Sequence, residues 1–417
     1  MPQPGPVWQA APAASFTTEE AAVAGLLQAE DARLALMPAV AAVKWQTHAP
    51  IFDPPRETAV IHRAGDLGEQ MGLAADPVRA LFELQAQLAR RVQSTLHRQW
   101  AHHGFSFAGP VTSLAQLRPR LDELTIQLLQ GLYLAAPALE RRGFAAQYAA
   151  LARLQLRDSH WSEAGRSQLL RAMARITRVR TPPEPRIRAS GILRVGTTGD
   201  YAPFSIETGG ALSGSDITLA QELAGSLNAR VAFVRTSWSS LLEDLTRGKF
   251  DLAIGGVSVT PAREARAAFS LGYSSGGKTI LARCADSGKY TSLAAVDQPR
   301  VRVIVNSGGT NEAYARANIH RARLLVYQDN RAVFDSIAAG GADVMITDDV
   351  EAELQSRRHR GLCRAYAGTL THSEKAILMP RDPELIALVN RWLQGELAAG
   401  EPDRLLKSYL DRESRAE

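Results

Sequence analysis

The pattern of hydrophobic and polar positions divides the chain into two parts of different character. Between residues 17 and 177, apolar residues recur at three- and four-residue steps, as at Leu26, Leu36 and Val40. This spacing is typical of amphipathic helices. Thr18 followed by two glutamates gives the first of these helices a capping start. Because strand patterns are absent from this stretch, it is predicted to fold as an all-α helical bundle.

Proline and capping residues indicate where further helices begin. Asp53-Pro54-Pro55 and Asp76-Pro77 each place a capping side chain directly before proline, which is favoured in the first turn of a helix. Three more helical stretches are predicted from the apolar spacing, at residues 113–134, 136–156 and 162–177.

The second part of the chain has the pattern of an α/β domain. Short apolar runs typical of buried strands alternate with helical stretches such as 217–227 and 332–339. The expected strands lie at residues 192–196, 231–234, 252–254, 301–305 and 324–326. Residues 178–190 lie between the two parts, are rich in proline and are predicted to form an extended, semi-rigid linker. Residues 1–16, rich in proline and alanine, are expected to be a flexible tail.

Length and composition narrow the classes of protein. A chain of 417 residues is expected to form two or three domains, and 45% hydrophobic with 22% charged residues is ordinary for a soluble protein. No apolar run approaches the ~18 residues that a membrane helix needs. The net charge of +5 is small and the arginines are scattered, which argues against nucleic-acid binding. Basic pockets for small di-acids account for these arginines equally well.

Four polar segments follow strands of the α/β part. They are residues 197–204, 255–263, 306–312 and 347–351. Open α/β sheets bind their ligands at the carboxyl ends of strands, so these segments are expected to meet. The glycine-rich turn of 306–312 leads into a helix, and its free N–H groups would point at an anion. Residues 347–351 place carboxylates at the end of a second strand. The pattern predicts an anion pocket that faces a carboxylic acid.

These segments resemble the periplasmic amino-acid-binding fold, and more closely cyclohexadienyl dehydratase, an enzyme built on that fold. That family converts prephenate to phenylpyruvate and arogenate to phenylalanine. The resemblance covers about residues 190–412. The matching phrases are Thr-Thr-Gly-Asp-Tyr at 197–201, Thr-Ser-Trp at 236–238, Gly-Lys-Thr at 277–279, Asn-x-Gly-Gly-Thr-Asn-Glu at 306–312 and Thr-Asp-x-x-Glu at 347–351.

The resemblance implies a two-lobed domain over residues 191–417. Its first lobe would comprise about 191–283 with 380–417, and its second lobe 284–379. Glu351 would be the general acid that protonates the departing hydroxyl, and Lys278, also counted as catalytic, would hold a substrate carboxylate. The resemblance also implies that Trp238 forms an aromatic side of the pocket and that Asp348 binds an ammonium group. Arg263, Thr310 and the N–H groups of Gly308 and Gly309 would bind carboxylates. Further substrate contacts are implied at Asp200, Tyr201, Ser258 and Asn306.

A second constellation lies in the helical part. Arg33, Lys44, Asp53 and Arg56 stand at offsets of 0, 11, 20 and 23, and Gln93 follows Arg56 by 37 residues. This spacing resembles the all-helical chorismate mutases, over about residues 17–175.

Arg118 corresponds to the arginine that completes the pocket within one chain in the exported class of these mutases, with Arg120 as the alternative. One position departs from the family, because Ala89 stands where a hydroxyl residue is usual.

The resemblance implies catalysis by positive charge alone, because chorismate rearranges without proton transfer or a nucleophile. Lys44 and Gln93 would contact the ether oxygen. Three arginines, Arg33, Arg56 and Arg118, would bind the two carboxylates, and Asp53 would orient its neighbours or accept the substrate hydroxyl.

Three other features admit weaker interpretations. Residues 272–279 satisfy the P-loop pattern, but an apolar run typical of a strand follows them where a P-loop requires a helix. His97, His102 and His103 do not share one helical face, which favours a surface location over a metal site. Cys284 and Cys363, the two cysteines, would be reduced in a cytosolic protein and could form a disulfide in an exported one.

The sequence therefore predicts a bifunctional enzyme without metal or cofactor. It would convert chorismate to prephenate and then prephenate to phenylpyruvate, and arogenate to phenylalanine. The resemblance also implies export to the periplasm, although residues 1–15 do not form a signal peptide. The alternative is a solute-binding or sensing protein with a helical partner domain and no turnover. Association into a homo-oligomer is left open.

Overall fold

The computed structural model describes residues 14–110 and 113–413, which form two compact units. One unit comprises residues 17–191 and is helical, and the other combines the segment before residue 17 with the chain from Ile192 onward. The predicted fold class, an all-α domain followed by a two-lobed α/β domain, is confirmed.

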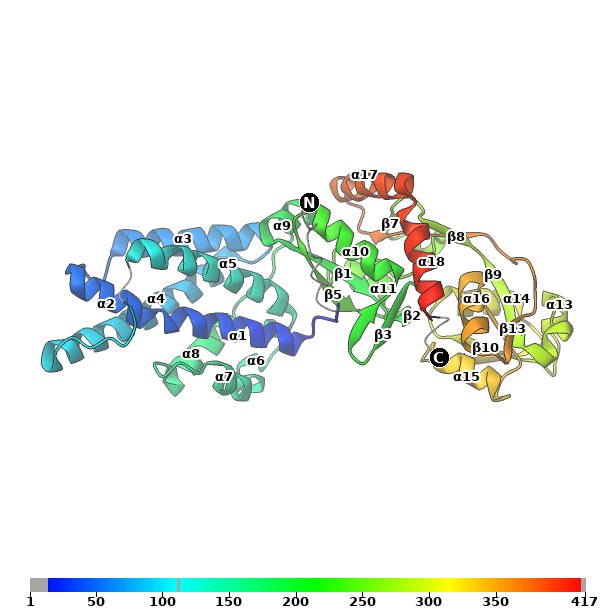
Figure 1. Cartoon of the computed structure of the whole chain (residues 1–417), viewed down its shortest axis with the longest axis horizontal. Helices are drawn as coiled ribbons and strands as arrows, with labels where there is room; N and C mark the ends of the chain where they lie inside the picture. The colour runs from blue at the N-terminus through cyan, green and yellow to red at the C-terminus, as the bar shows by residue number, and fades with distance from the viewer. Residues whose placement is uncertain (1–13, 111–112, 414–417) are drawn as a thin grey trace, which may run out of the picture. The chain divides into compact units, whose positions relative to one another are not determined.

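The helical unit is built around long helices that pack along one another, α1 against α5 and α3 against α4 (Figure 1). Its helices are α1 (Glu19–Ala35), α2 (Met37–Thr47), α3 (Pro54–Gln70), α4 (Ala75–His103), α5 (Leu114–Leu139), α6 (Phe144–Gln147), α7 (Ala149–Gln155), α8 (Glu163–Met173) and α9 (Pro183–Ser190). Side chains of Thr18, Asp53, Ser113 and Ser162 cap four of them, as residues of these types do. The predicted break near residue 135 was wrong, because α5 continues through Pro137 to Leu139.

The segment predicted to be an extended linker is part of the helical unit. Prolines occupy the first turn of α9, where a missing N–H costs nothing, so the proline-rich stretch begins a helix. Arg186 of this helix is 5% exposed and donates a hydrogen bond to Tyr133 Oη. Gln130 Nε2 donates to Ser190 O at 2.8 Å, which ties the end of α9 to α5. The linker prediction was therefore wrong for residues 183–190.

The α/β unit contains two five-stranded sheets. The first has the order β5-β1-β6-β15-β7 and the second β11-β10-β12-β9-β13. The strands of the first are β1 (Ile192–Thr197), β5 (Arg230–Arg235), β6 (Leu252–Ala253), β7 (Ala268–Phe269) and β15 (Leu378–Met379). Those of the second are β9 (Lys278–Arg283), β10 (Arg302–Asn306), β11 (Arg323–Tyr327), β12 (Val344–Asp348) and β13 (Leu362–Arg364). Each of the five predicted strands is present, to within one or two residues at its ends.

Smaller elements complete this unit. They are β2 (Asp200–Tyr201), β3 (Ser205–Thr208), β4 (Ala211–Ser213), β8 (Ser274–Gly276), β14 (Ser373–Lys375), α10 (Ser215–Ser226), α11 (Leu241–Thr246), α12 (Pro261–Glu264), η1 (Cys284–Lys289), α13 (Leu293–Val296), α14 (Thr310–Asn318), α15 (Ala332–Ala338), α16 (Asp349–Arg358), α17 (Pro383–Ala399) and α18 (Glu401–Glu413).

The boundary between the two lobes differs from the expected one. Strand β9 was assigned to the first lobe, but it pairs with β12 in the second sheet, from Lys278 opposite Asp348 to Ala282 opposite Val344. Strand β15 was assigned to the second lobe, but it pairs with β6 and β7 in the first sheet. The chain passes between the sheets at the β8–β14 pair instead. Residues 272–279, which match the P-loop pattern, lie on β8 and the start of β9, so no helix follows them as a P-loop requires.

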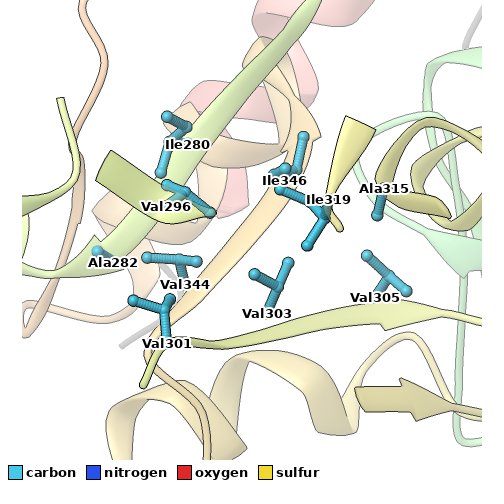
Figure 2. Packing of buried hydrophobic residues seen from close by; sticks show 10 residues of the cluster. All are labelled: Ile280, Ala282, Val296, Val301, Val303, Val305, Ala315, Ile319, Val344 and Ile346. Carbon is cyan, nitrogen blue, oxygen red and sulfur yellow. The ribbon is translucent and has the colours of Figure 1, made fainter. Parts of the chain in front are cut away.

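The second sheet is buried on both faces. Alternate residues of its central strands point to opposite sides, so Ile280, Val303 and Val344 pack in one cluster while Leu281 and Ile304 pack in another. Figure 2 shows the first cluster, in which Val303 of β10 and Val344 of β12 lie side by side on one face of the sheet. Burying each such aliphatic side chain stabilises the fold by about 1.5–3 kcal/mol. This packing fixes the strand ends that carry the polar residues.

Part of the expected tail is ordered on the α/β unit. Ala14 forms a bridge with Leu212, and Phe16 forms one with Phe233. The guanidinium carbon of Arg235 lies 3.9 Å from the centre of the Phe16 ring. The prediction of flexibility was wrong for residues 14–16, while residues 1–13 lie outside the described part of the chain.

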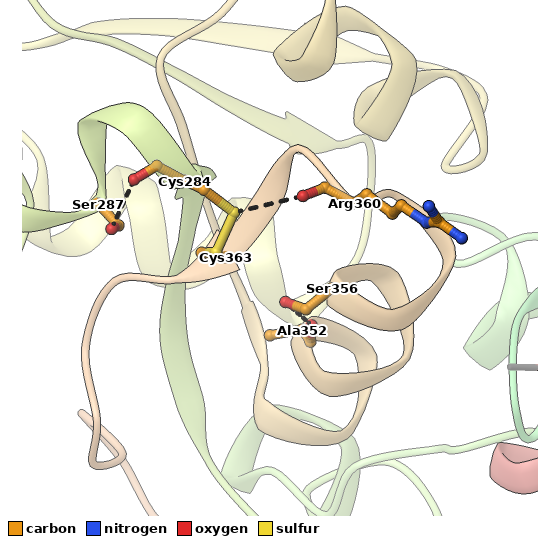
Figure 3. The surroundings of a disulfide bond; sticks show 6 residues. All are labelled: Cys284, Ser287, Ala352, Ser356, Arg360 and Cys363. Atoms are coloured by element: carbon orange, nitrogen blue, oxygen red, sulfur yellow. Dashed lines mark hydrogen bonds between the residues drawn. A yellow bond between two sulfur atoms is a disulfide. The ribbon is translucent and has the colours of Figure 1, made fainter.

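Cys284 and Cys363 form a disulfide (Figure 3). The bond joins the end of β9 to β13, two strands that already pair side by side, and it closes a loop with a sequence separation of 79 residues. The bonded alternative for these cysteines is therefore the one that the structure adopts.

Replacing both cysteines with serine should lower the free energy of unfolding of the α/β unit by about 2–4 kcal/mol, because the open loop gains conformational entropy when unfolded. Urea titrations of the oxidised protein and of Cys284→Ser/Cys363→Ser, followed by a spectroscopic signal of this unit, measure the difference. Coincident midpoints would show that the disulfide contributes nothing to stability.

No helix in the described parts of the chain is long and apolar enough to cross a membrane. His102 and His103 are exposed, as predicted, whereas His97 is half-buried: its ring contacts Ala41 O at 2.9 Å and packs edge-on against Trp45. Within residues 14–110 and 113–413, no group of three or more His, Cys, Asp or Glu side chains is arranged to hold a metal ion.

Candidate active sites

The helical unit contains a cavity of about 240 Å³. The residues singled out from the sequence all line it, although they come from five helices and the loop before α3. They are Arg33 on α1, Lys44 on α2, Asp53 before α3, Arg56 on α3, Gln93 on α4 and Arg118 on α5. Arg120 is not among the lining residues and pairs with Glu123 in solvent. Arg118 therefore lies at the cavity, whereas Arg120, the alternative, does not.

Arg33 is held at the cavity by polar contacts with α5. Its Nη1 donates to Leu121 O and to Thr125 Oγ1, each at 3.1 Å. Burial lowers the pKa of Arg33, although the charges of Glu30 and Asp122 oppose the shift. A partly desolvated guanidinium binds a carboxylate strongly, because it has little water to lose.

Glu30 is a buried acid in the same cavity that the sequence did not single out. Its carboxyl accepts a hydrogen bond from Gln85 Nε2 at 2.8 Å and is 2% exposed. Burial raises the pKa of Glu30 to about 7, against the lowering effects of Arg33 and Gln85. An uncharged Glu30 leaves the positive charge of Arg33 available to an anion.

Lys44 lies across the cavity with its Nζ donating to Ile51 O at 2.8 Å. Burial lowers the pKa of Lys44, while the carboxylates of Glu57 and Asp53 raise it. Asp53 also caps α3, since its Oδ1 accepts from Arg56 N at 3.3 Å. Asp53 therefore has a structural role in addition to any contact with substrate.

Gln93 is 5% exposed, and its Nε2 lies 3.8 Å from Met37 Sδ, a weak acceptor. Its Oε1 has no hydrogen-bond partner among the described residues. Ala89, one turn earlier on the same helix, also lines the cavity and brings no hydroxyl. Gln93 thus has its amide free to meet a polar ligand.

The α/β unit contains a second, small cavity at the ends of its strands. Its volume is about 20 Å³, room for roughly one water molecule, so a larger ligand requires a wider cleft than this one. Eight of the residues singled out from the sequence line it: Tyr201, Trp238, Ser258, Arg263, Asn306, Gly309, Thr310 and Asp348. Glu351 lines it as well, and Lys278 and Asp200 lie just behind it.

Asp348 lies at the end of β12, between two buried lysines. Lys278 Nζ donates to its Oδ1 and Lys375 Nζ to its Oδ2, each at 2.7 Å, and Tyr201 Oη also donates to Oδ2. Although burial alone would raise it, the charges of Lys375 and Lys278 hold the pKa of Asp348 far below its usual range. Asp348 is therefore an anchored carboxylate whose two oxygens are already bonded.

Glu351 is the buried carboxyl of this site and is 1% exposed. It lies in the first turn of α16, where Oε1 accepts from Asn330 Nδ2 at 3.1 Å and Oε2 accepts from Thr347 Oγ1. Burial raises the pKa of Glu351 to about 7, reinforced by the charge of Asp348, while the hydrogen bonds from Thr347 and Asn330 and the charge of Lys278 oppose the shift. Near neutral pH a large fraction of Glu351 carries a proton.

Arg263 provides a buried cation on the other side of the cavity. Its Nη1 donates to Ser258 O at 2.8 Å, and its guanidinium carbon lies 5.9 Å from the ring centre of Trp238. Burial lowers the pKa of Arg263 to about 10, and the charge of Asp348 opposes this. Trp238 Nε1 in turn donates to Asp200 Oδ1 at 3.1 Å, so Asp200 positions the indole from outside the cavity.

The glycine-rich turn contributes less than expected. Gly308 has φ +78°, which favours glycine, but its N–H donates to Glu312 Oε2 at 2.6 Å and is not free for an anion. Gly309 and Thr310 line the cavity. The expectation for Gly308 was therefore wrong, because an acidic side chain of the following helix already occupies this N–H.

Three residues that complete the second site were missed. Lys375 lies on β14, Asn311 on α14 and Asn330 before α15. Asn311 Nδ2 donates to Asn306 Oδ1 and to Thr347 Oγ1, so it supports the side chains around Glu351. Asn311 stands in the Asn-x-Gly-Gly-Thr-Asn-Glu segment but was not singled out, whereas Lys375 and Asn330 stand in no motif. Lys375 reaches the cleft only because β14 pairs with β8, a strand distant in sequence.

The fold and the second site together define a two-lobed solute-binding domain that carries a buried acid in its cleft. The chain belongs to the family of bacterial extracellular solute-binding proteins, family 3, whose profile matches residues 193–412. Its helical unit matches chorismate mutase type II over residues 24–94.

Two relatives are similar to the α/β unit. Cyclohexadienyl dehydratase of Pseudomonas aeruginosa is 46% identical over 210 residues, covering 50% of this chain and 78% of the relative. The lysine/arginine/ornithine-binding periplasmic protein of Escherichia coli is 30% identical over 232 residues, covering 52% of this chain and 87% of the relative.

A solved structure is similar as well. It is the ancestral amino acid-binding protein AncCDT-1, described as a precursor of cyclohexadienyl dehydratase, with 33% identity and a TM-score of 0.51, covering 55% of this chain and 100% of that one. The α/β unit is thus similar both to a protein named as an enzyme and to proteins named as binding proteins.

Proposed function

We propose that the chain is a bifunctional enzyme that rearranges chorismate to prephenate in the helical unit and converts prephenate to phenylpyruvate in the α/β unit. The observation that carries the second activity is Glu351, a buried carboxyl with a raised pKa in a cleft with basic side chains. A protein that only binds a solute has no need of a protonated carboxyl there. The similarity to cyclohexadienyl dehydratase and to chorismate mutase type II supports both assignments.

In the helical cavity the reaction needs no acid or base. Arg33, Arg56 and Arg118 bind the two carboxylates of chorismate and hold it in a compact conformer. Lys44 and Gln93 contact the ether oxygen, where negative charge grows as the C–O bond stretches. A rate acceleration of ~10⁶-fold requires about 8 kcal/mol, which preorganised cations in a desolvated cavity can supply.

In the α/β cleft, Arg263 and Lys375 bind the carboxylates of prephenate. When the bond from the ring carbon to its carboxylate breaks, the electron pair enters the ring and carbon dioxide leaves. The C–O bond at the opposite ring carbon breaks in the same step, and Glu351 donates its proton so that water departs instead of hydroxide. Asp348 keeps the two lysines in place.

The bonding of Asp348 bears on the second substrate, arogenate. Arogenate carries an ammonium group where prephenate has a keto group, and both oxygens of Asp348 are already bonded to lysines. The ammonium group would have to compete with Lys278 and Lys375. Arogenate is therefore expected to react, with a lower kcat/KM than prephenate.

The experiment that tests this function is incubation of the purified chain with prephenate, and separately with arogenate. Phenylpyruvate is followed by its absorbance in alkali, and phenylalanine by chromatography. Formation of phenylpyruvate supports the dehydratase, and binding of prephenate without any product would leave the solute-binding alternative.

The pH dependence of the dehydratase follows from Glu351. A general acid acts in its protonated form, and the pKa of Glu351 is raised to about 7, so the active fraction falls as pH rises through 7. We expect kcat/KM for prephenate to decrease about tenfold per pH unit above this value. Initial rates between pH 6 and 9 measure it, and a constant rate up to pH 9 would exclude Glu351 as the acid.

We also propose that the protein acts in the periplasm. The Cys284–Cys363 disulfide is favoured in oxidising compartments, and the matched family is described as extracellular. Fractionation of cells that express the natural gene, followed by detection of the protein, tests this location.

A further inference from the structure

A third cavity lies directly behind Glu351. It has a volume of about 440 Å³ and is lined by the β2–β3 hairpin on one side and by α15 and α16 on the other. Its inner end is formed by Glu351 and Gln355, which are 1% and 5% exposed, and its lining also includes the solvent-exposed residues Arg331 and Asp335. Glu351 lines both this cavity, here called the rear cavity, and the substrate cavity.

The proposed reaction makes a path for protons necessary. Prephenate carries two carboxylates, while the products are phenylpyruvate with one carboxylate, neutral carbon dioxide and water. Each turnover therefore consumes one proton, and Glu351 is left as a carboxylate that must be protonated again. The substrate cavity, at about 20 Å³, holds no column of water that could supply it.

The inner end of the rear cavity has an unpaired polar atom that suits water. Gln355 Oε1 is buried and has no hydrogen-bond partner among the described residues. Asn330 Oδ1 has none either, but Asn330 lines the substrate cavity beside Glu351. Gln355 follows Glu351 by four residues on α16, so both side chains lie on one face of the helix. A buried amide oxygen without a partner is costly, and a bound water molecule relieves that cost. A cavity of this volume has room for several water molecules, each with a share of about 30 Å³.

We propose that the rear cavity supplies solvent protons to Glu351 through water that Gln355 positions. Glu351 is then protonated again by protons that do not cross the substrate cavity. The proposal rests on the dehydratase function above. It assigns Gln355 a positioning role, because it acts on the proton donor through water and touches no substrate.

The experiment separates the first turnover from the steady state. Gln355→Leu keeps the size of the side chain but removes its polar atoms, and most of Glu351 starts protonated at pH 6.5. The first turnover should then match the unmodified protein in rapid-quench measurements, and the following steady-state kcat should fall about tenfold. The solvent deuterium isotope effect on kcat should rise, since proton delivery has become rate-limiting.

A second variant narrows the same cavity from its other side. Ile206 on β3 lines the rear cavity and does not contact α16 through any hydrogen bond, so Ile206→Trp obstructs the path while leaving Glu351 and Gln355 unchanged. It should show the same normal first turnover and slow steady state. Mutase activity of both variants should equal that of the unmodified chain, which controls for protein quality.

Two results would overturn the proposal. One is an unchanged steady-state kcat in both variants, which would mean that Glu351 is protonated through the substrate cavity when the lobes open. The other is an equal loss in the first turnover and the steady state, which would mean that Gln355 only holds Glu351 in position. Failure of the proposed function is distinct from both, because the unmodified chain would then form no phenylpyruvate at all.

Discussion

Glu351→Gln should lower the rate of phenylpyruvate formation from prephenate by about 10²–10⁴-fold, the usual contribution of a positioned general acid. Glutamine has the same size and can remain bonded to Asn330 and Thr347, but it has no proton to give to the departing hydroxyl. Because the substituted side chain stays buried and uncharged, prephenate should still bind. Steady-state kinetics and a separate binding measurement test the two parts of this expectation.

A matched control is available on the same helix. Glu353 is exposed and pairs with Arg357, so Glu353→Gln should leave dehydratase activity unchanged. Mutase activity should also be unchanged in both variants, because Glu351 and the helical cavity belong to different units. If Glu351→Gln kept more than about a tenth of the normal rate, another group would have to donate the proton.

Lys44→Ala should lower the rate of chorismate rearrangement by about 10²–10³-fold or more, the effect of removing one strong donor from a preorganised site. The loss should fall mainly on kcat, because Lys44 meets the ether oxygen, whose charge develops only in the transition state. Conversion of added prephenate by the same variant should be normal, which shows that the α/β unit is intact, and the helical content from circular dichroism checks the folding of the helical unit. Disappearance of chorismate measures the mutase step directly.

The control for this variant removes a cation outside the cavity. Arg120 lies two residues after Arg118 but pairs with Glu123 and does not line the cavity, so Arg120→Ala should be as active as the unmodified chain. Arg118→Ala should lose mutase activity, mainly through weaker binding of a carboxylate. Equal activities of Arg118→Ala and Arg120→Ala would falsify the choice of Arg118.

The sequence predicted the parts of the molecule that depend on local pattern. The three- and four-residue apolar spacing predicted the helical unit, and the short apolar runs predicted β1, β5 and β6 of the first sheet and β10 and β11 of the second. The cations of the helical cavity were found because Arg33, Lys44, Asp53 and Arg56 stand at a recognisable spacing. Glu351 was identified because the Thr-Asp-x-x-Glu segment at 347–351 resembles the corresponding segment of cyclohexadienyl dehydratase.

The features that depend on pairing between distant segments could not be predicted in this way. Lys375 reaches Asp348 only because β14 pairs with β8 where the chain passes between the lobes. The lobe boundary was misplaced for the same reason, since β9 and β15 each pair with strands far away in sequence. A proline-rich stretch that begins a helix, as at α9, has the same composition as an extended linker, and only packing against the bundle distinguishes the two.

The most direct test of the two-site account is the time course of chorismate, prephenate and phenylpyruvate after chorismate is added to the unmodified chain alone. The account predicts that chorismate disappears, that prephenate is formed and then consumed, and that phenylpyruvate accumulates to the amount of chorismate supplied. Persistence of chorismate, or accumulation of prephenate as the final product, would contradict it.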